Sequence, residues 1–165
     1  MKHLFLFITI FSVSGFANDL ATTTDGQMVY IFDNNTWVYL EEASEDICPY
    51  IFASKPWVDY DEDGYTSSDE FYGQKTDWYM GADQQITFAT HWYNLAGSSF
   101  EIMVFPPNGN VFIAGSGTIG SDNQWIWKDY DHVYDLQQYG GLGEWYHVWI
   151  VDYTYYVMDK FTIHP

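Results

Sequence analysis

The chain has 165 residues, of which 23 are Asp or Glu, five are Lys and none is Arg, so its formal net charge is −18. Such a surface repels nucleic acid and anionic lipid and attracts cations, so we expect no nucleic-acid partner. Aromatic residues make up 21% of the chain, a composition too apolar for a disordered acidic tail. The sequence therefore predicts a folded, acidic protein.

The first 17 residues have the pattern of a secretory signal peptide. Lys2 supplies a positive start, Leu4 to Val13 form an apolar run, and small residues stand at Gly15 and Ala17. The alternative is a membrane anchor, but a run of this length is too short to cross a bilayer. We therefore expect cleavage after Ala17, no membrane insertion, and a mature protein that is secreted or periplasmic.

Residues 18–42 are predicted to form an appended N-terminal β-hairpin. Two β-rich runs, Gln27–Phe32 and Thr36–Glu41, flank Asp33-Asn34-Asn35, residue types that tolerate the left-handed conformations of tight turns. The stretch resembles a hairpin common at the start of small secreted bacterial proteins, and the resemblance implies no activity. An isolated hairpin is only marginally stable in water, so we expect this one either to pack on another part of the chain or to remain an appendage. Residues 43–58 are predicted to be a linker and a first strand.

The stretch DYDEDGYTSSDE, residues 59–70, holds six carboxylates in twelve positions and no Lys or Arg. It fits the pattern D-x-[DN]-x-[DN]-G-x5-E and resembles the calcium loop of EF-hand proteins, with Gly64 at the sharp turn. The resemblance implies an all-oxygen site for one Ca²⁺, a hard cation that takes roughly six to eight oxygen ligands. The implied ligands are the side chains of Asp59, Asp61 and Asp63, the carbonyl oxygen of Tyr65, Ser67 through a water, and both carboxylate oxygens of Glu70.

The flanks of this loop differ from those of a paired EF-hand. Position 8 is Thr66 rather than an apolar β-branched residue, Pro56 stands where a helix would enter, and the sequence holds no second loop of this pattern. On the exit side, Ser67 and Glu70 have capping-box spacing, and Gly73 is placed to end a single helical turn. We therefore expect a lone calcium loop set into a β protein. The alternative is a solvated acidic loop without a specific metal.

Six β-rich runs follow, separated by turn residues such as Pro106-Pro107-Asn108-Gly109 and Gly140-Gly141. They are rich in Val, Ile, Thr and aromatic residues and carry no long helical period. Runs of this length and spacing predict an all-β fold, in which residues 71–165 form an antiparallel β-sandwich. The predicted strands are residues 85–93, 99–105, 110–119, 123–130, 144–152 and 155–163.

Two local patterns in this region resemble bacterial immunoglobulin-like domains. The run FEIMVFPPNG resembles the corner in which a P-x-G turn joins two strands, and GLGEWYHVWIVDYTYYVMDKFTI is similar to the closing hairpin of those domains. In this hairpin Gly143, Trp145 and Tyr146 match the opening and Asp152 the turn, while Tyr153 replaces the usual turn glycine. The resemblance implies an immunoglobulin-like β-sandwich and carries no activity with it.

The Trp-rich fifth run leaves a choice between a ligand platform and a core. Alternate residues of a strand point to opposite faces, so Trp145, His147 and Trp149 share one face, and Tyr146 and Val148 lie on the other, which is expected to pack in the core. If exposed, Trp145 and Trp149 would offer flat rings to a pyranose. The alternative is that both faces are covered, one by the partner sheet and the other by the N-terminal hairpin.

No sequence motif selects a catalytic residue or a zinc site, because the His residues lack metal-ligand spacing and no nucleophile or phosphate-loop pattern occurs. Asp129, Asp131 and Asp135 lack the Gly and closing Glu of a calcium loop, so we expect an ordinary exposed loop there. Cys48 is alone and is either a buried small residue or a free thiol.

We expect a secreted, non-catalytic calcium-binding protein, an envelope or extracellular binding module in which the calcium is structural and the partner is a glycan or a surface protein. The alternatives are a carbohydrate-binding module that uses exposed Trp and Tyr, and a small secreted glycosidase.

Overall fold

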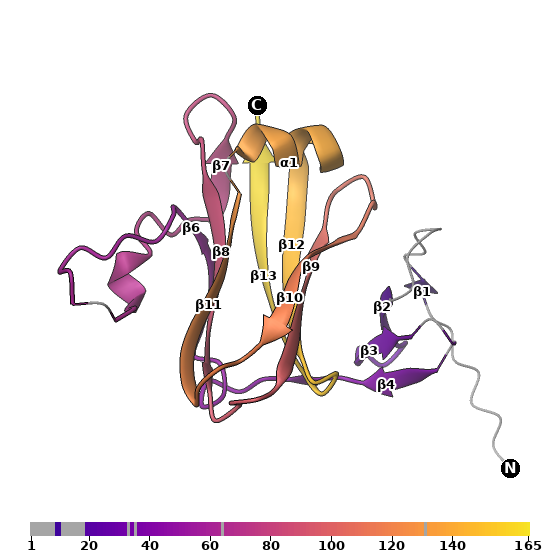
Figure 1. Ribbon diagram of the computed structural model, residues 1–165. Helices are drawn as coiled ribbons and strands as arrows, with labels where there is room; N and C mark the ends of the chain where they lie inside the picture. Colours follow the sequence, from indigo (N-terminus) through magenta and orange to yellow (C-terminus); the bar gives the residue numbers. More distant parts are fainter. Residues whose placement is uncertain (1–8, 11–18, 33, 35, 64, 131) are drawn as a thin grey trace, which may run out of the picture.

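Two β-sheets pack face to face in the computed structural model, which describes residues 9–10, 19–32, 34, 36–63, 65–130 and 132–165 (Figure 1). The smaller sheet has the order β11-β8-β6, and the larger has the order β10-β9-β12-β13-β5, with β7 also paired to β13. Neighbouring strands are antiparallel, apart from the short β5 and β7, which run parallel to β13. The strands are β5 (Glu41–Glu42), β6 (Tyr50–Ser54), β7 (Asp77–Tyr79), β8 (Ile86–Tyr93), β9 (Ser99–Phe105), β10 (Phe112–Thr118), β11 (Asn123–Tyr130), β12 (Gly143–Val151) and β13 (Tyr155–His164).

The core between the two sheets is built mainly from aromatic side chains. Trp78, Trp92, Trp145, Trp149 and Phe161 are fully buried there. β8, the middle strand of the smaller sheet, is almost entirely buried along its length because both of its faces are covered. Burying a large apolar side chain contributes about 1.5–3 kcal/mol relative to leaving it in water, so these rings dominate the stability of the sandwich.

A second core lies on the opposite face of the larger sheet, beneath a sheet of N-terminal strands with the order β1-β2-β3-β4. The strands are β1 (Thr9–Ile10), β2 (Asp19–Thr22), β3 (Met28–Ile31) and β4 (Trp37–Tyr39). The buried residues of this second core are Leu20, Tyr30, Leu40, Met103, Val148 and Ile150. The hydroxyl of Tyr30 donates a hydrogen bond of 2.6 Å to Glu101 Oε2 on β9, and burial together with this carboxylate raises the pKa of Tyr30 well above its usual value.

The turn between β12 and β13 helps to hold the N-terminal sheet in place. Asp152 and Tyr153 both have positive φ angles, 48° and 51°, as in a type I′ turn, whose residues are usually Asn, Asp or Gly. Tyr153 adopts this conformation without being glycine, and its ring packs against Tyr30 and Phe32, with centroid distances of 4.7 and 5.0 Å. The aromatic contacts therefore offset the strain of the turn.

The predicted runs of residues 85–163 correspond to β8 through β13, with bounds that differ by at most two residues, and the mostly β, antiparallel character is confirmed. Immunoglobulin-like connectivity stays a prediction. β3 and β4 lie where the hairpin was predicted, and β2 adds a strand to it. β1 lies within the residues predicted as a signal peptide, most of which are outside the described part of the chain. Two strands of the sandwich, β5 and β6, precede the acidic loop in the chain, so the loop is an insertion within the sandwich.

The sequence prediction missed a short helix, α1 (Val133–Gly140), that crosses one end of the sandwich (Figure 1). Val133 and Leu136 are buried in the main core, whereas Asp135 is exposed in the first turn, where its charge favours the helix dipole. The expectation of an exposed loop at Asp135 is therefore corrected, and Asp131 lies outside the described residues. Among the described residues, no helix has both the length and the apolar character needed to span a bilayer.

Gly140, at the end of α1, is required by close packing. A Cβ atom at this position would lie 2.2 Å from Pro106 Cβ and 2.2 Å from the ring of the buried Trp145. We expect Gly140→Ala to lower the free energy of unfolding by about 1–3 kcal/mol, because overpacking outweighs the gain in helix propensity. Urea denaturation measures this loss. Gly81→Ala is the matched control, since a Cβ there meets nothing within 4 Å; equal stability losses in the two variants would contradict the packing argument.

Candidate metal site

The acidic loop projects from the side of the smaller sheet, between β6 and β7, on the side of the sandwich opposite the N-terminal sheet (Figure 1). Two backbone hydrogen bonds close its stem. Val58 N–H donates to the carbonyl oxygen of Glu70 at 3.1 Å, and Lys55 N–H donates to that of Tyr72 at 3.0 Å. The two ends of the loop are therefore fixed relative to each other by the main chain.

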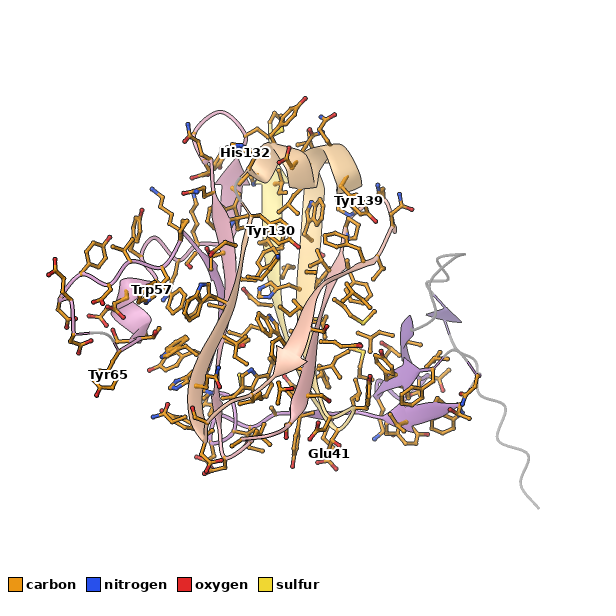
Figure 2. The ribbon with its side chains drawn as sticks, viewed as in Figure 1. Glu41, Trp57, Tyr65, Tyr130, His132 and Tyr139 are labelled. Carbon is orange, nitrogen blue, oxygen red and sulfur yellow. The ribbon has the colours of Figure 1, made fainter. Side chains whose placement is uncertain are left out.

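Aromatic residues on both sides of the loop anchor it to the outer face of the smaller sheet. Trp57 stacks on Trp127, with ring centroids 5.5 Å apart, and projects between the loop and the sheet (Figure 2). Phe71 is buried and packs against Trp125 and Trp127, at 5.0 and 5.7 Å. A loop that carries six carboxylates is thus held by apolar contacts at its two ends.

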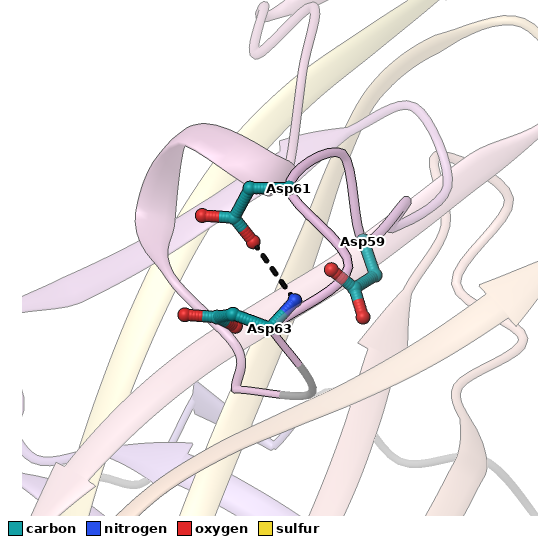
Figure 3. Close-up of side chains that lie close together, drawn as sticks. All are labelled: Asp59, Asp61 and Asp63. Carbon is teal, nitrogen blue, oxygen red and sulfur yellow. Dashed lines mark hydrogen bonds between the residues drawn. The ribbon is translucent and has the colours of Figure 1, made fainter.

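Asp59, Asp61 and Asp63 come together within the loop, each with a ligand oxygen within 4.8 Å of the others (Figure 3). Asp59 is half-buried and the other two are exposed. Local hydrogen bonds shape the turn: Asp63 N–H donates to Asp61 Oδ1 at 3.2 Å, and Tyr65 N–H donates to Asp63 Oδ1 at 2.7 Å. Two like charges about 4 Å apart repel by roughly 1–4 kcal/mol near a protein surface, and a bound cation would offset that repulsion.

Glu70 is the last residue of a 3₁₀ turn, η1 (Ser68–Glu70), and its side chain is only 4% exposed. Its Oε2 accepts hydrogen bonds from Ser67 N–H at 2.8 Å and from Trp57 Nε1–H at 3.2 Å. Its Oε1 is buried and has no hydrogen-bond partner among the described residues. A buried carboxylate oxygen without a donor is unfavourable, so this atom is suited to a cation.

The other implied ligands have different roles in the described structure. The side chain of Tyr65 points outward and is 78% exposed, which leaves only its backbone for the site (Figure 2). Ser67 Oγ donates to Asp69 Oδ1 at 2.5 Å, a bond that lowers the pKa of Asp69. Gly64 lies outside the described residues. The capping-box spacing of Ser67 and Glu70 is realised through the Ser67 N–H to Glu70 bond, and the turn ends at Phe71, before Gly73.

The donor set fits a hard divalent cation. Among the described residues, the group within mutual reach consists of Asp59, Asp61 and Asp63 and does not include Glu70. Glu70 stands at the closing position of the loop with its Oε1 unsatisfied. A site made of carboxylate and carbonyl oxygens binds hard cations such as Ca²⁺ and Mg²⁺ in preference to softer metals, because the softer metals prefer imidazole and thiolate ligands. The fit therefore rests on three converging aspartates and one orphaned buried oxygen.

Of the two alternatives for Trp145 and Trp149, the structure shows the core and not the ligand platform, because both indoles are completely buried. The alternation along β12 is as predicted, but both faces of the strand are covered. Trp37 and Tyr39 on β4 are exposed instead, at 41% and 43%. Their rings meet at 79°, so they do not form one flat surface for a sugar ring.

No family model matches the chain, and no curated protein is significantly similar to it in sequence. The chemistry of the loop therefore has to be argued from its own residues. Elsewhere in the described residues, no second group of carboxylate, His or Cys side chains converges as the three aspartates do. Asp129 accepts a hydrogen bond from the Thr87 hydroxyl, and Cys48 is buried, with a pKa that burial raises to about 12.

Proposed function

We propose that this is a secreted, non-catalytic β-sandwich protein whose acidic loop binds one Ca²⁺ as a structural ion, and that it serves as an envelope or extracellular binding module. The proposal for the ion is carried by the convergence of Asp59, Asp61 and Asp63, and it is supported by the buried Oε1 of Glu70, which has no hydrogen-bond partner among the described residues. The proposal for the compartment is supported by the signal-like first 17 residues.

The bound ion would act as a cross-link across the insertion. Asp59 follows the incoming side of the stem, and Glu70 belongs to the outgoing side, next to Phe71 in the aromatic layer. A cation held by both ends neutralises clustered charge and ties the loop to the sheet. Because the stem is already closed by hydrogen bonds and aromatic packing, the ion adds stability to a loop that is largely formed without it.

The expected gain in stability is modest. Extracellular calcium modules bind with a Kd of about 10⁻⁴ to 10⁻³ M. At roughly 1 mM free Ca²⁺, mass action then contributes about 0.4–1.4 kcal/mol to the free energy of unfolding. For a chain of this size that is a rise of only a few degrees in Tm, about 2–4 °C per kcal/mol.

Glu70→Gln is expected to abolish the stabilisation by Ca²⁺, because it removes the charge of the closing ligand. The metal-free protein should be no less stable than the wild type, since the amide oxygen of Gln can accept the same two hydrogen bonds and no charge remains buried. The measurement is Tm by calorimetry, with Ca²⁺ and with chelator. Glu62→Gln is the matched control, because it removes the same charge from a position of the loop that is not an implied ligand.

Three outcomes are informative. A Ca²⁺-dependent rise in Tm that survives in Glu62→Gln and disappears in Glu70→Gln supports the site. A rise that persists in Glu70→Gln would place the ion elsewhere. No rise in the wild type, together with no binding heat in titration calorimetry, would leave the loop as a solvated acidic turn.

A further inference from the structure

The two carboxylate oxygens of Glu70 have different surroundings. Oε2 accepts the main-chain N–H of Ser67 and the indole N–H of Trp57, whereas Oε1 has no partner among the described residues. The whole side chain is 96% buried, since only 4% of it is exposed. One oxygen is therefore committed to protein donors and the other is left for a ligand. This differs from the bidentate Glu70 that the EF-hand resemblance implied.

The donor from Trp57 is itself firmly placed. Its ring stacks on Trp127 at an interplanar angle of 27°, and Val58, the next residue, is hydrogen-bonded through its backbone to the carbonyl of Glu70. The indole N–H thus reaches Oε2 from a side chain whose backbone and ring are both fixed. Freeing Oε2 for a metal would break this bond and leave the N–H of the half-buried Trp57 without its acceptor, which is unfavourable.

We propose that Trp57 is a specificity-determining residue of the loop: together with the main-chain N–H of Ser67, its indole N–H holds Oε2 and restricts Glu70 to metal coordination through Oε1 alone. This inference rests on the proposed cation site, and it names a residue that sets the preference of that site between Ca²⁺ and Mg²⁺. Trp57 acts through Glu70 and touches no metal, so it is a positioning residue.

The consequence is a site with reduced preference for Ca²⁺ over Mg²⁺. Ca²⁺ accepts roughly six to eight oxygens in a flexible shell and benefits from a carboxylate that offers both of its oxygens. Mg²⁺ is smaller and requires near-octahedral geometry, which one carboxylate oxygen satisfies and two oxygens of the same carboxylate distort. Withholding Oε2 therefore weakens Ca²⁺ binding and leaves Mg²⁺ binding almost unchanged.

The test is titration of the full chain with Ca²⁺ and with Mg²⁺ in the wild type, Trp57→Phe and Trp127→Phe, using isothermal calorimetry. Trp57→Phe keeps an aromatic ring on Trp127 but has no N–H, so Ca²⁺ affinity should rise about fivefold, the effect of one ordinary hydrogen bond, while Mg²⁺ affinity changes less than about twofold. Trp127→Phe alters the same stack and keeps the Trp57 donor, so the ratio of the two affinities should stay at the wild-type value.

A second measurement covers the case in which Trp57→Phe fails to fold: in the ¹⁵N spectrum of the wild type, the Trp57 indole N–H should keep its hydrogen-bonded shift when Ca²⁺ saturates the loop. Loss of that shift, or an unchanged or weaker Ca²⁺ affinity in folded Trp57→Phe, overturns the role of Trp57 while the cation site stands. Absence of binding by either ion in the wild type overturns the cation site and this inference with it.

Discussion

Trp145→Ala is expected to lower the free energy of unfolding by about 3–5 kcal/mol, the largest effect of any substitution considered for this protein. The indole is 0% exposed, it stacks on Phe161 with centroids 5.9 Å apart, and its N–H donates to the carbonyl oxygen of Gly141 at 3.2 Å. Truncation would leave a cavity at the point where α1 closes the end of the sandwich. Because a domain has only about 5–15 kcal/mol of stability, this loss approaches complete unfolding.

Urea denaturation followed by far-UV circular dichroism measures the loss, with Trp37→Ala as the matched control. Trp37 is 41% exposed and touches Tyr39 at the surface, so its removal should change stability by less than about 1 kcal/mol. If Trp145→Ala instead kept wild-type stability and lost affinity for a sugar, that result would contradict the core role of Trp145 and support its role in sugar binding.

The second large effect concerns pH and His147, whose imidazole is completely buried between the sheets. Trp149 Nε1–H donates to its Nδ1 at 3.1 Å, so the neutral ring carries its proton on Nε2, which lies 3.5 Å from Asp159 Oδ2. The ring also stacks on Phe88 at 4.5 Å. Burial lowers the pKa of His147 below its usual value, although Asp159 opposes this shift.

A histidine whose pKa is lower in the folded state binds its proton more readily when the chain unfolds. Stability from the buried neutral ring is therefore fully present above the ordinary pKa, about 6.5, and is lost as the pH falls below it. For a single titrating group this loss is at most about 1.4 kcal/mol for each pH unit.

The measurement is a series of urea denaturation curves between pH 7.5 and pH 5. His147→Asn should lower stability at every pH but flatten its decline below pH 6.5, because the amide can accept the Trp149 hydrogen bond and does not titrate. His132→Asn, which removes an exposed imidazole at the start of α1, should keep the wild-type slope. A wild-type slope in His147→Asn would assign the pH dependence to another group.

The strands were predictable because their cause is local. Val, Ile, Thr and aromatic residues in short runs between Gly, Pro and Asn turns favour extended backbone wherever the chain folds. The acidic loop was predictable for the same reason: the spacing of Asp59, Asp61 and Asp63 within five residues brings their oxygens together through local turns, and the structure places them within 4.8 Å.

Helix α1 was missed because it has only eight residues and includes Gly140, so its local signal is weak. Val133, Leu136 and Gly140 do repeat at i, i+3 and i+7, and this pattern was the available signal. What stabilises the helix is the open end of a sandwich whose strands come from distant parts of the sequence. Tertiary packing overrode a weak local preference.

The sequence by itself determined that the chain folds as a mostly β protein, where the six strands of residues 85–163 lie, and which residues alternate across β12. It also determined that three aspartates converge in one loop. Only the tertiary structure decided that both faces of β12 are covered, which turned Trp145 and Trp149 from a possible platform into core, and that Trp57 holds one oxygen of Glu70 and leaves the other unsatisfied. The physical reason is that burial and long-range hydrogen bonds depend on which segments, distant in the sequence, pack against a given strand or side chain. A local sequence pattern does not specify that packing.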